Sequence, residues 1–249
     1  MWIPEGSFWM GSDRAERQLA YGLSSQAVRG ARWFEAEVSR RHLTLAAFCI
    51  DRFLVTQAQY ATFVERTGHR PPGIRKDEYL RQGFLVHDYD RAVTRYLWRN
   101  GRPPENLVDH PVVLVSADDA EVYCRWLHPA FRLPTEAEWE KAARGDHGRI
   151  FPWGDHWDAT RLNSATRGPG GTTPVTRYPT GASPYGLFDP AGNVFQWTAS
   201  RLADGQAVVK GCAWDDEAGL CRPAFRHGRP PQSRHILIGF RCAETAMKP

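Results

Sequence analysis

The sequence is poor in the features that define several common protein classes. Its 249 residues include five cysteines, too few to suggest a disulfide framework. No apolar run approaches the roughly 18 residues that a membrane-spanning helix requires. The amino end, MWIPEGSFWMGSDRAE, lacks the basic segment and the long apolar core of a secretory signal. These absences predict a cytoplasmic chain with no membrane partner.

A strong excess of charge is also missing. The formal net charge is +4, and the arginines are spread along the chain among acids. Nucleic acid is therefore not an expected partner, because proteins that bind it concentrate positive charge on one face. The chain has no phosphate-cradling glycine loop and no nucleophile elbow, and its nine histidines are scattered.

Turn-forming residues and tryptophan, by contrast, are plentiful, with 22 Gly, 18 Pro and 10 Trp. This composition disfavours a helical bundle and favours an irregular α+β domain. Helix-start signals occur at Thr56, Ser116 and Thr135, and Gly68 and Gly145 are expected to end two of these helices. The apolar residues expected to be buried in the first two helices are Ala58, Tyr60, Ala61, Phe63, Val64, Ala120, Val122, Tyr123, Trp126 and Leu127.

We expect one domain over residues 1–249, since no linker and no internal repeat divides the chain. Residues 13–37 and 70–109 are polar and rich in helix breakers, and we expect both to be surface inserts. The second insert carries enough aromatic residues to cover the carboxyl-terminal loops. These aromatic residues are Tyr79, Phe84, Tyr89, Tyr96 and Trp98.

Two of the cysteines lie within apolar-periodic segments. Cys49 is part of AAFCIDRF and Cys124 is part of AEVYCRWL. Unpaired cysteines in such surroundings behave as small apolar residues. We therefore expect both to be inert, buried thiols.

Six phrases follow one another in order between residues 3 and 243: IPEGSFWMGS, HPVVLVSADDAEVYCRWL, LPTEAEWEKAARG, FPWGD, YGLFDPAGNVFQWT and IGFRCA. In this order they resemble the formylglycine-generating enzyme family, also called the sulfatase-modifying factor family. The resemblance implies a fold related to C-type lectins, with a small twisted antiparallel sheet, a few peripheral helices and many loops.

The residues of these phrases also predict folding roles of their own. Trp139, Phe195 and Trp197 should pack inward. IGFRC should form a final strand that closes the sheet.

The resemblance also implies a chemistry. Formylglycine-generating members are copper-dependent oxidases that convert a cysteine in a sulfatase peptide, and two cysteines separated by four residues carry the reaction. In KGCAWDDEAGLC, Cys221 falls at the second of these positions and Asp216 at the first. A carboxylate is a hard donor and a poor replacement for a thiolate on Cu(I), so copper is not an expected cofactor.

Cys212 offers a substitute for the missing cysteine, because a hairpin could bring it to Cys221. The alternative is that the two cysteines are semi-buried thiols with no joint task. If the chain is an oxidase, its altered metal site would contain Cys221, Cys212 and Asp216.

The family also tends to hold structural calcium, which implies calcium ligands at Asn163 and Asn193. Gln196 replaces the acid of the second calcium motif, and Arg167 stands where an acid would assist the first. Both changes lower the local negative charge and weaken the case for calcium there. The acids at 215–217 offer a separate site for a hard cation, or else form a solvated loop.

Residues 210–235 form the expected binding surface for a protein or peptide ligand. After Cys221, RPAFRHGRPPQSRH gathers four arginines near Trp214 and the acidic turn. Guanidinium groups there suit a carboxylate- or phosphate-bearing partner, or a peptide laid along a groove. Alternatively, these arginines pair with the acidic turn and brace the loops. The residues expected to bind the ligand are Trp214, Asp215, Glu217, Arg222, Arg226, His227, Arg229 and Arg234.

The favoured hypothesis is therefore a non-catalytic or divergent member of this family that recognises a protein or peptide through residues 210–235. One alternative is the copper-dependent oxidase that acts on a sulfatase peptide. Another is a variable, lectin-like ligand-display protein. The resemblance also implies a signalling or defence protein as a partner, either fused to this chain or encoded beside it.

Overall fold

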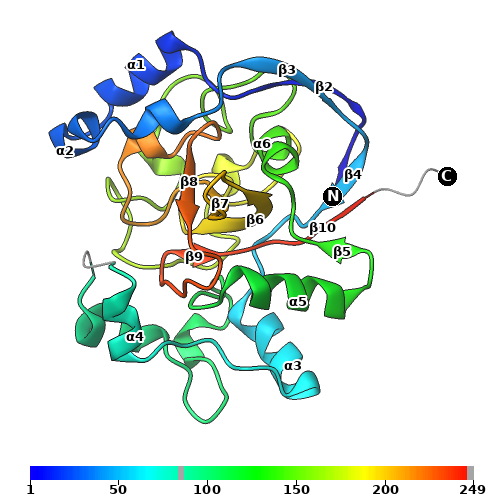
Figure 1. Ribbon diagram of the computed structural model, residues 1–249, viewed down its shortest axis with the longest axis vertical. Helices are drawn as coiled ribbons and strands as arrows, with labels where there is room; N and C mark the ends of the chain where they lie inside the picture. Colours follow the sequence, from blue (N-terminus) through cyan, green and yellow to red (C-terminus); the bar gives the residue numbers. More distant parts are fainter. Residues whose placement is uncertain (84–86, 246–249) are drawn as a thin grey trace.

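The computed structural model describes residues 1–83 and 87–245 and combines short helices with small sheets (Figure 1). The α-helices are α1 (Arg14–Gly22), α2 (Gln26–Gly30), α3 (Gln57–Thr67), α4 (Lys76–Arg81), α5 (Ala117–Leu127) and α6 (Glu136–Arg144). Single helical turns are η1 (Trp33–Ala36), η2 (Tyr89–Val93), η3 (Thr94–Tyr96), η4 (Glu105–Leu107), η5 (Ala159–Arg161), η6 (Pro179–Gly181) and η7 (Ala218–Leu220). The α+β class expected from the sequence is confirmed.

The strands form three separate sheets among the described residues, where the sequence predicted one. The central sheet has the order β8 (Arg226–Arg229), β7 (Ala207–Lys210), β6 (Phe195–Arg201) and β9 (Ile238–Gly239). A second sheet has the order β1 (Trp2–Ile3), β4 (Phe48–Ile50), β10 (Ala243–Thr245) and β5 (Phe131–Arg132). The third pairs β2 (Gly6–Met10) with β3 (Arg41–Leu45).

The closing segment does not form the single final strand that was expected. Its first part, β9, pairs in parallel with β6 of the central sheet. Its last part, β10, pairs antiparallel with β4 and β5 of the second sheet. The carboxyl-terminal segment therefore links two sheets, and the central sheet is mixed rather than purely antiparallel.

The three predicted helix starts are confirmed as capping boxes. In α3 the Thr56 hydroxyl accepts from the Gln59 backbone N–H, and the Gln59 side chain accepts from the Thr56 N–H. The same reciprocal pattern begins α5 at Ser116 and α6 at Thr135. Each such cap contributes about 1 kcal/mol because it satisfies orphan N–H groups of the first turn.

The predicted buried faces are only partly correct. Tyr60, Phe63, Ala120 and Tyr123 are buried, and Ala61, Val64 and Trp126 are partly buried. Ala58 is exposed, and Val122 and Leu127 are 45% and 43% exposed. Val122 lies beside the stripe of positions that faces the core, because successive helical residues are rotated by about 100°. Leu127 is the last residue of α5.

Residues 13–37 are mostly exposed, as expected, but they also contribute to the core, which was not expected. They form α1, α2 and η1, and Ala20, Val28 and Phe34 join the main hydrophobic cluster. Glu16 and Glu37 are buried as well and pair with buried arginines. Two charges of the segment are therefore neutralised inside the protein, while most of its other polar residues are exposed.

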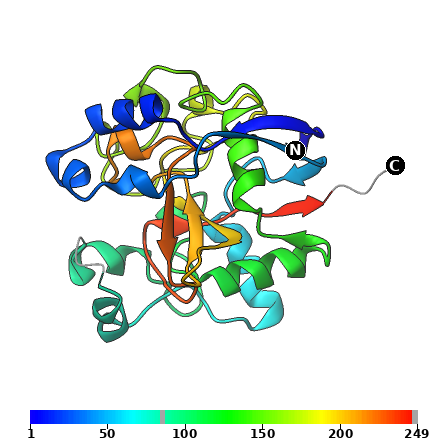
Figure 2. The same ribbon diagram turned by 45° about the horizontal axis from the view of Figure 1, so that its top comes forward.

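Residues 70–109 form α4 and η2 to η4 and build a second hydrophobic cluster. Tyr79 and Tyr96 are buried there together with Trp214 and Ile236 of the carboxyl-terminal loops. The expected covering of those loops is thus present, although Phe84 lies outside the described residues. In Figures 1 and 2 this region and the α1–α2 region lie on opposite sides of β7 and β8.

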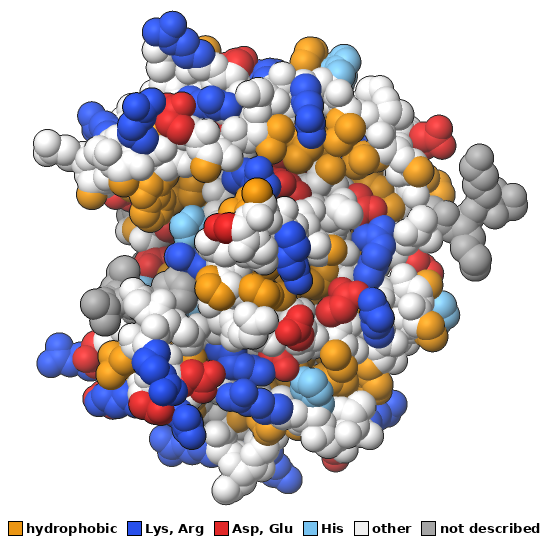
Figure 3. Space-filling model, in the orientation of Figure 1, with side chains coloured by type: hydrophobic (Ala, Val, Ile, Leu, Met, Phe, Trp, Pro, Cys, Tyr) orange, Lys and Arg blue, Asp and Glu red, His pale blue; other side chains and the backbone are white. Residues whose placement is uncertain are grey.

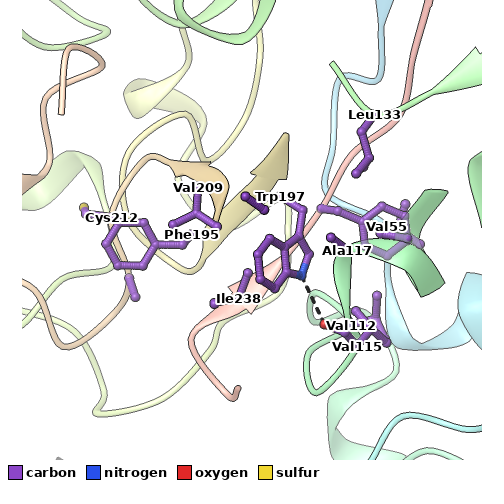
Figure 4. Close-up of a cluster of buried hydrophobic side chains, with 14 of the residues drawn as sticks. Val55, Val112, Val115, Ala117, Leu133, Phe195, Trp197, Val209, Cys212 and Ile238 are labelled. Carbon is purple, nitrogen blue, oxygen red and sulfur yellow. Dashed lines mark hydrogen bonds between the residues drawn. The ribbon is translucent and has the colours of Figure 1, made fainter. Parts of the chain in front are cut away.

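The main core lies between the central sheet and α5. Trp197 of β6 is fully buried and donates its indole N–H to the Val115 carbonyl at 3.1 Å (Figure 4). Trp139 of α6 donates in the same way to the buried Gln196 amide oxygen at 2.7 Å. The inward packing predicted for Trp139, Phe195 and Trp197 is confirmed, and burial of each large ring contributes roughly 2–3 kcal/mol.

Four of the five cysteines form disulfides, which the sequence did not predict. Cys124 of α5 is bonded to Cys242, and Cys212 is bonded to Cys221. The expectation of an inert thiol at Cys124 is therefore wrong, because the fold brings two cysteines 118 positions apart to a Cα separation of 5.6 Å. Cys49 is a free thiol, as expected, but it is only partly buried.

Candidate functional site

A hollow of about 210 Å³ lies between the α2–η1 region and the end of the central sheet. We call it the acidic-loop pocket. In Figure 3 a recess between the α1–α2 and α4 regions exposes His, Lys or Arg and hydrophobic side chains together. The lining residues are Val28, Trp33, Phe195, Asp215, Asp216, Glu217, Leu220, His227, Arg229, His235 and Leu237.

The loop that carries the three acids is fixed at both ends. It leaves β7 through Gly211, whose φ of +79° favours glycine, and the Cys212–Cys221 disulfide closes it. Inside the loop, Asp216 accepts from the Ala213 backbone N–H at 2.7 Å. Its own backbone carbonyl accepts from Ala165 at 3.1 Å. These contacts hold the acids at the pocket wall.

The three acids have different partners, and the pKa of Asp216 is strongly shifted. Burial raises the pKa of Asp216 to about 8, and the neighbouring Asp215 adds to the rise. Asp216 is therefore mostly protonated at neutral pH. Asp215 lies 2.7 Å from His87 Nε2, and Glu217 accepts from the Ser25 backbone N–H at 2.5 Å.

The basic side chains of the pocket differ in charge, because its two lining histidines are neutral and its arginine is protonated. Burial, and then the nearby Arg229, lower the pKa of His227 to about 4. Burial lowers the pKa of His235 to about 3, with His87 and Arg229 acting in the same direction. Both imidazoles are therefore neutral near pH 7. Arg229 stays protonated, since burial lowers its pKa only to about 10 while Asp216 opposes the shift.

Two buried polar atoms of lining residues lack a hydrogen-bond partner within the described part of the chain. They are Asp215 Oδ1 and His227 Nε2. Buried polar groups in native proteins are nearly always satisfied by protein, water or a ligand. Two polar atoms of the pocket's lining residues are therefore left unsatisfied by the described protein groups.

The structure brings together half of the residues predicted to bind a ligand. Asp215, Glu217, His227 and Arg229 line the acidic-loop pocket. Trp214 does not line it: its ring is buried in the cluster built by residues 70–109, with the Arg95 guanidinium 5.4 Å from its centroid. Ligand binding by the four lining residues stays a prediction.

The other three predicted arginines are held elsewhere, which corrects their expected placement. Arg222 is fully buried and pairs with Glu16 and Glu37. Arg226 and Arg234 form ion pairs too. Their partners, Glu136 and Asp119, belong to α6 and α5 rather than to the acidic turn.

Sequence reasoning missed several residues of this site. Trp33 of η1 is 41% exposed and stacks on His227 with ring centroids 5.8 Å apart. Val28 also comes from the segment expected to lie on the surface, and His87 from the second insert. The only local signal was a tryptophan, Trp33, within a polar segment. Nothing in the sequence indicated that it would pack against β8.

The cysteines do not form the donor set that Cu(I) requires. Cys212 and Cys221 are joined by a sulfur–sulfur bond of 2.00 Å, so neither provides a thiolate. The third candidate, Asp216, is a hard and mostly protonated donor. The interpretation of Cys212 and Cys221 as unlinked thiols is wrong, and the disulfide form does not fit a copper site.

The two asparagines of the calcium prediction lie together and are fully buried. Asn163 Nδ2 donates to the Gly171 carbonyl at 2.8 Å, and Asn193 Nδ2 donates to Asp189 at 2.9 Å. Burial raises the pKa of Asp189 to about 7, which weakens its negative charge. Both amide nitrogens are engaged with protein groups, whereas Asn163 Oδ1 has no hydrogen-bond partner among the described residues. Calcium binding there stays a prediction.

Comparisons with known proteins agree with the motif order. The model of the sulfatase-modifying factor enzyme 1-like domain matches residues 1–246. An inactive C-alpha-formylglycine-generating enzyme 2 from Mus musculus is 32% identical over 286 residues, covering 99% of this chain and 86% of the relative. A formylglycine-generating enzyme from Mus musculus is 29% identical over 292 residues, covering 97% and 73%.

Solved structures support the same fold. PvdO from Pseudomonas aeruginosa superimposes with a TM-score of 0.72 at 22% identity, covering 99% of this chain and 94% of that one. At this identity the likeness concerns the fold alone. The domain model matches residues 1–246, and the relatives include an active and an inactive formylglycine-generating enzyme. The chain therefore belongs to the formylglycine-generating enzyme family.

Proposed function

We propose that this protein is a non-oxidising member of the family that recognises a peptide segment of a partner protein in the acidic-loop pocket. One observation carries the proposal. The loop that should supply two thiolates holds a half-buried Asp216 and a Cys221 that is bonded to Cys212. This arrangement offers a rigid recognition surface and no soft metal ligands.

The lining of the pocket supports a peptide side chain as the occupant. Phe195, Leu220 and Leu237 are apolar, while Asp215 and His227 each hold a buried polar atom without a protein partner. A volume of about 210 Å³ is below the range of about 300–1,000 Å³ that is usual for sites of drug-sized ligands. The pocket therefore suits one largely apolar side chain that also donates a hydrogen bond, such as tyrosine or tryptophan.

Selection from a random peptide display library tests this proposal directly. We expect enrichment of peptides with a tyrosine or tryptophan, and loss of their binding in the variant Trp33→Ala/His227→Ala. Trp2→Ala is a matched control, because Trp2 is 56% exposed and lies on β1 in a different sheet. If the selected peptides bind the pocket variant as well as they bind the unaltered protein, the proposal fails.

The copper-dependent oxidase remains the second candidate, because the fold does place Cys212 and Cys221 side by side. Reduction of the disulfide would create two neighbouring soft donors. We expect the reduced protein to bind no Cu(I) tightly and to form no aldehyde in a cysteine-containing peptide under air. Tight one-to-one Cu(I) binding that disappears in Cys221→Ser would favour the oxidase instead.

The compartment is also a proposal. Disulfides persist in oxidising surroundings and are rare in the cytosol. The structure holds two of them, so we propose an oxidising compartment in place of the cytoplasm that the sequence suggested. None of the described helices is both long and apolar enough to span a bilayer. Alkylation of free thiols in freshly lysed cells, followed by mass analysis, would report the native state of these four cysteines.

A further inference from the structure

We propose that a second hollow binds an acidic peptide segment of a partner protein. This hollow, which we call the arginine groove, holds about 430 Å³ and lies in the region of α4 and η2 to η4, where Lys and Arg gather in Figure 3. It shares no lining residue with the acidic-loop pocket, so the inference is independent of the proposed function. Its lining residues are Thr94, Arg95, Leu97, Arg99, Arg102, Pro103, Pro104 and Glu105.

A tight turn sets two of the arginines side by side. Arg99 and Arg102 exchange both backbone hydrogen bonds, each 3.0 Å long. Between them Asn100 and Gly101 have φ values of +52° and +73°, as a type I′ hairpin turn requires. Residues paired in this way lie about 5.5 Å apart and project on the same face. The turn therefore presents a double guanidinium at the edge of the groove.

The third arginine is held in place by its neighbours. Arg95 donates to the Gly170 carbonyl at 2.7 Å, and its guanidinium lies 4.9 Å from the Tyr96 ring centroid. A Cβ added to Gly171 would come within 2.9 Å of Arg95 Nη2, so the glycine leaves room for the guanidinium in this position. A guanidinium has five N–H donors, and most of those of Arg95 are left for a ligand.

The charge of the three arginines is not neutralised by the protein. Within residues 1–83 and 87–245, no carboxylate forms an ion pair with Arg95, Arg99 or Arg102. By contrast, the nearby Arg75 and Arg81 of the α4 region both pair with Asp77. The groove therefore gathers three arginines that no described carboxylate neutralises.

The remaining lining residues favour a peptide over a phosphate chain. Planar guanidinium groups bind carboxylates with two parallel hydrogen bonds. Glu105 is the one acid of the lining, and it can accept a peptide N–H, a donor that a phosphate chain does not provide. Leu97, Pro103 and Pro104 add an apolar wall. In an extended peptide, acidic residues two positions apart lie roughly 6–7 Å from each other on one face, which matches the paired arginines.

Fluorescence anisotropy with the labelled peptide Gly-Glu-Ala-Glu-Ala-Gly tests the inference on the full chain. We expect binding that weakens with salt and that falls by about tenfold or more in Arg99→Ala/Arg102→Ala, because two charge-assisted contacts are lost. A peptide with Gln in place of both Glu should not bind. Trp33→Ala, which alters the acidic-loop pocket, should leave this binding unchanged.

The matched control is Arg14→Ala/Arg41→Ala, which removes the same charge at two exposed positions of α1 and β3. Equal loss of binding in this control would reduce the effect to net charge and overturn the proposal. Absence of binding by the unaltered protein, or equal binding of the Gln peptide, would overturn it as well. Displacement of the peptide by pyrophosphate at lower concentration than by free peptide would reassign the groove to phosphate-bearing ligands.

Discussion

Arg222 and Glu37 lie 185 positions apart in the sequence and form a fully buried ion pair, with 2.5 Å between Arg222 Nη2 and Glu37 Oε1. The same guanidinium also contacts Glu16 at 3.1 Å. This pair fastens η7 and the acidic loop to the α1–η1 segment, which supplies Val28 and Trp33 to the pocket. The wall of the candidate site therefore depends on buried charges that do not themselves line the pocket.

Replacement of Arg222 by methionine should destabilise the protein strongly. Removal of one partner from a buried ion pair leaves uncompensated charge and costs about 3–5 kcal/mol. Here two buried carboxylates, Glu16 and Glu37, would lose their shared partner. Urea denaturation followed by tryptophan fluorescence measures the free energy of unfolding.

Arg41→Met is the control for Arg222→Met, because Arg41 is exposed on β3. Its free energy of unfolding should stay within about 0.5 kcal/mol of the unaltered value. An Arg222→Met variant as stable as this control would show that the buried pair contributes nothing, contrary to our reading of the site.

The pH dependence of stability should reveal the protonated state of Asp216. Its pKa is raised from an ordinary 3.8 to about 8 in the folded protein, so folding takes up a proton between these values. Stability therefore falls as the pH rises from about 4 to about 8, by at most ~1.4 kcal/mol per pH unit for this group. Asp216→Asn removes the ionisable group, and with it the loss of stability at high pH. It keeps an oxygen that can accept from the Ala213 N–H.

Urea denaturation at pH 5 and pH 8 checks this prediction. We expect the gain in stability of Asp216→Asn over the unaltered protein to be larger at pH 8 than at pH 5. Glu105→Gln is the comparison variant, since Glu105 is exposed, and its effect should be the same at both values. A gain that is equal at both pH values would mean that Asp216 is ionised in the folded protein.

The two disulfides should contribute unequally to stability. A closed loop constrains the unfolded chain more when it is longer, by about 3 kcal/mol for 15 residues and about 4.7 for 100. Cys124 and Cys242 are 118 positions apart, whereas Cys212 and Cys221 are 9 apart. Cys124→Ala/Cys242→Ala should therefore lower the free energy of unfolding more than Cys212→Ala/Cys221→Ala.

A thiol titration supplies the companion measurement. Denatured without reductant, the protein should show one reactive thiol, that of Cys49, and after reduction all five. Five thiols in the non-reduced sample of oxidatively purified protein would contradict both bonds. Three would leave one bond, and mass analysis of its peptides would identify which.

The parts of the structure that the sequence predicts depend on neighbouring residues. The capping boxes at Thr56, Ser116 and Thr135 join atoms three residues apart, so their pattern can be read along the chain. The order of the family motifs similarly identified the fold. Local signals of this kind are strong because only a few residue types can satisfy the free N–H groups at the start of a helix.

The parts that the sequence did not predict depend on residues far apart. Glu16 and Glu37 read as solvated charges until the fold places Arg222 beside them. Likewise, nothing near Cys124 indicates that Cys242 will meet it. The pocket combines both kinds of information: its acidic loop was visible in the sequence, but Trp33 and Val28 reach it only through long-range packing.

Substitution of Gly219 by alanine should disrupt the acidic loop without any change of charge. A Cβ at Gly219 in η7 would lie 2.4 Å from the Ala20 backbone carbonyl and 2.1 Å from Ser24 Oγ. Because the carbonyl belongs to helix α1, it cannot move aside cheaply, and overpacking of this kind costs typically about 1–3 kcal/mol. Leu220 and the acids next to it should shift, so the peptides selected for the acidic-loop pocket should bind more weakly. Gly22→Ala is the matched control, since a Cβ there meets nothing within 4 Å. Equal stability and equal peptide binding in the two variants would mean that the contact between η7 and α1 does not position the pocket.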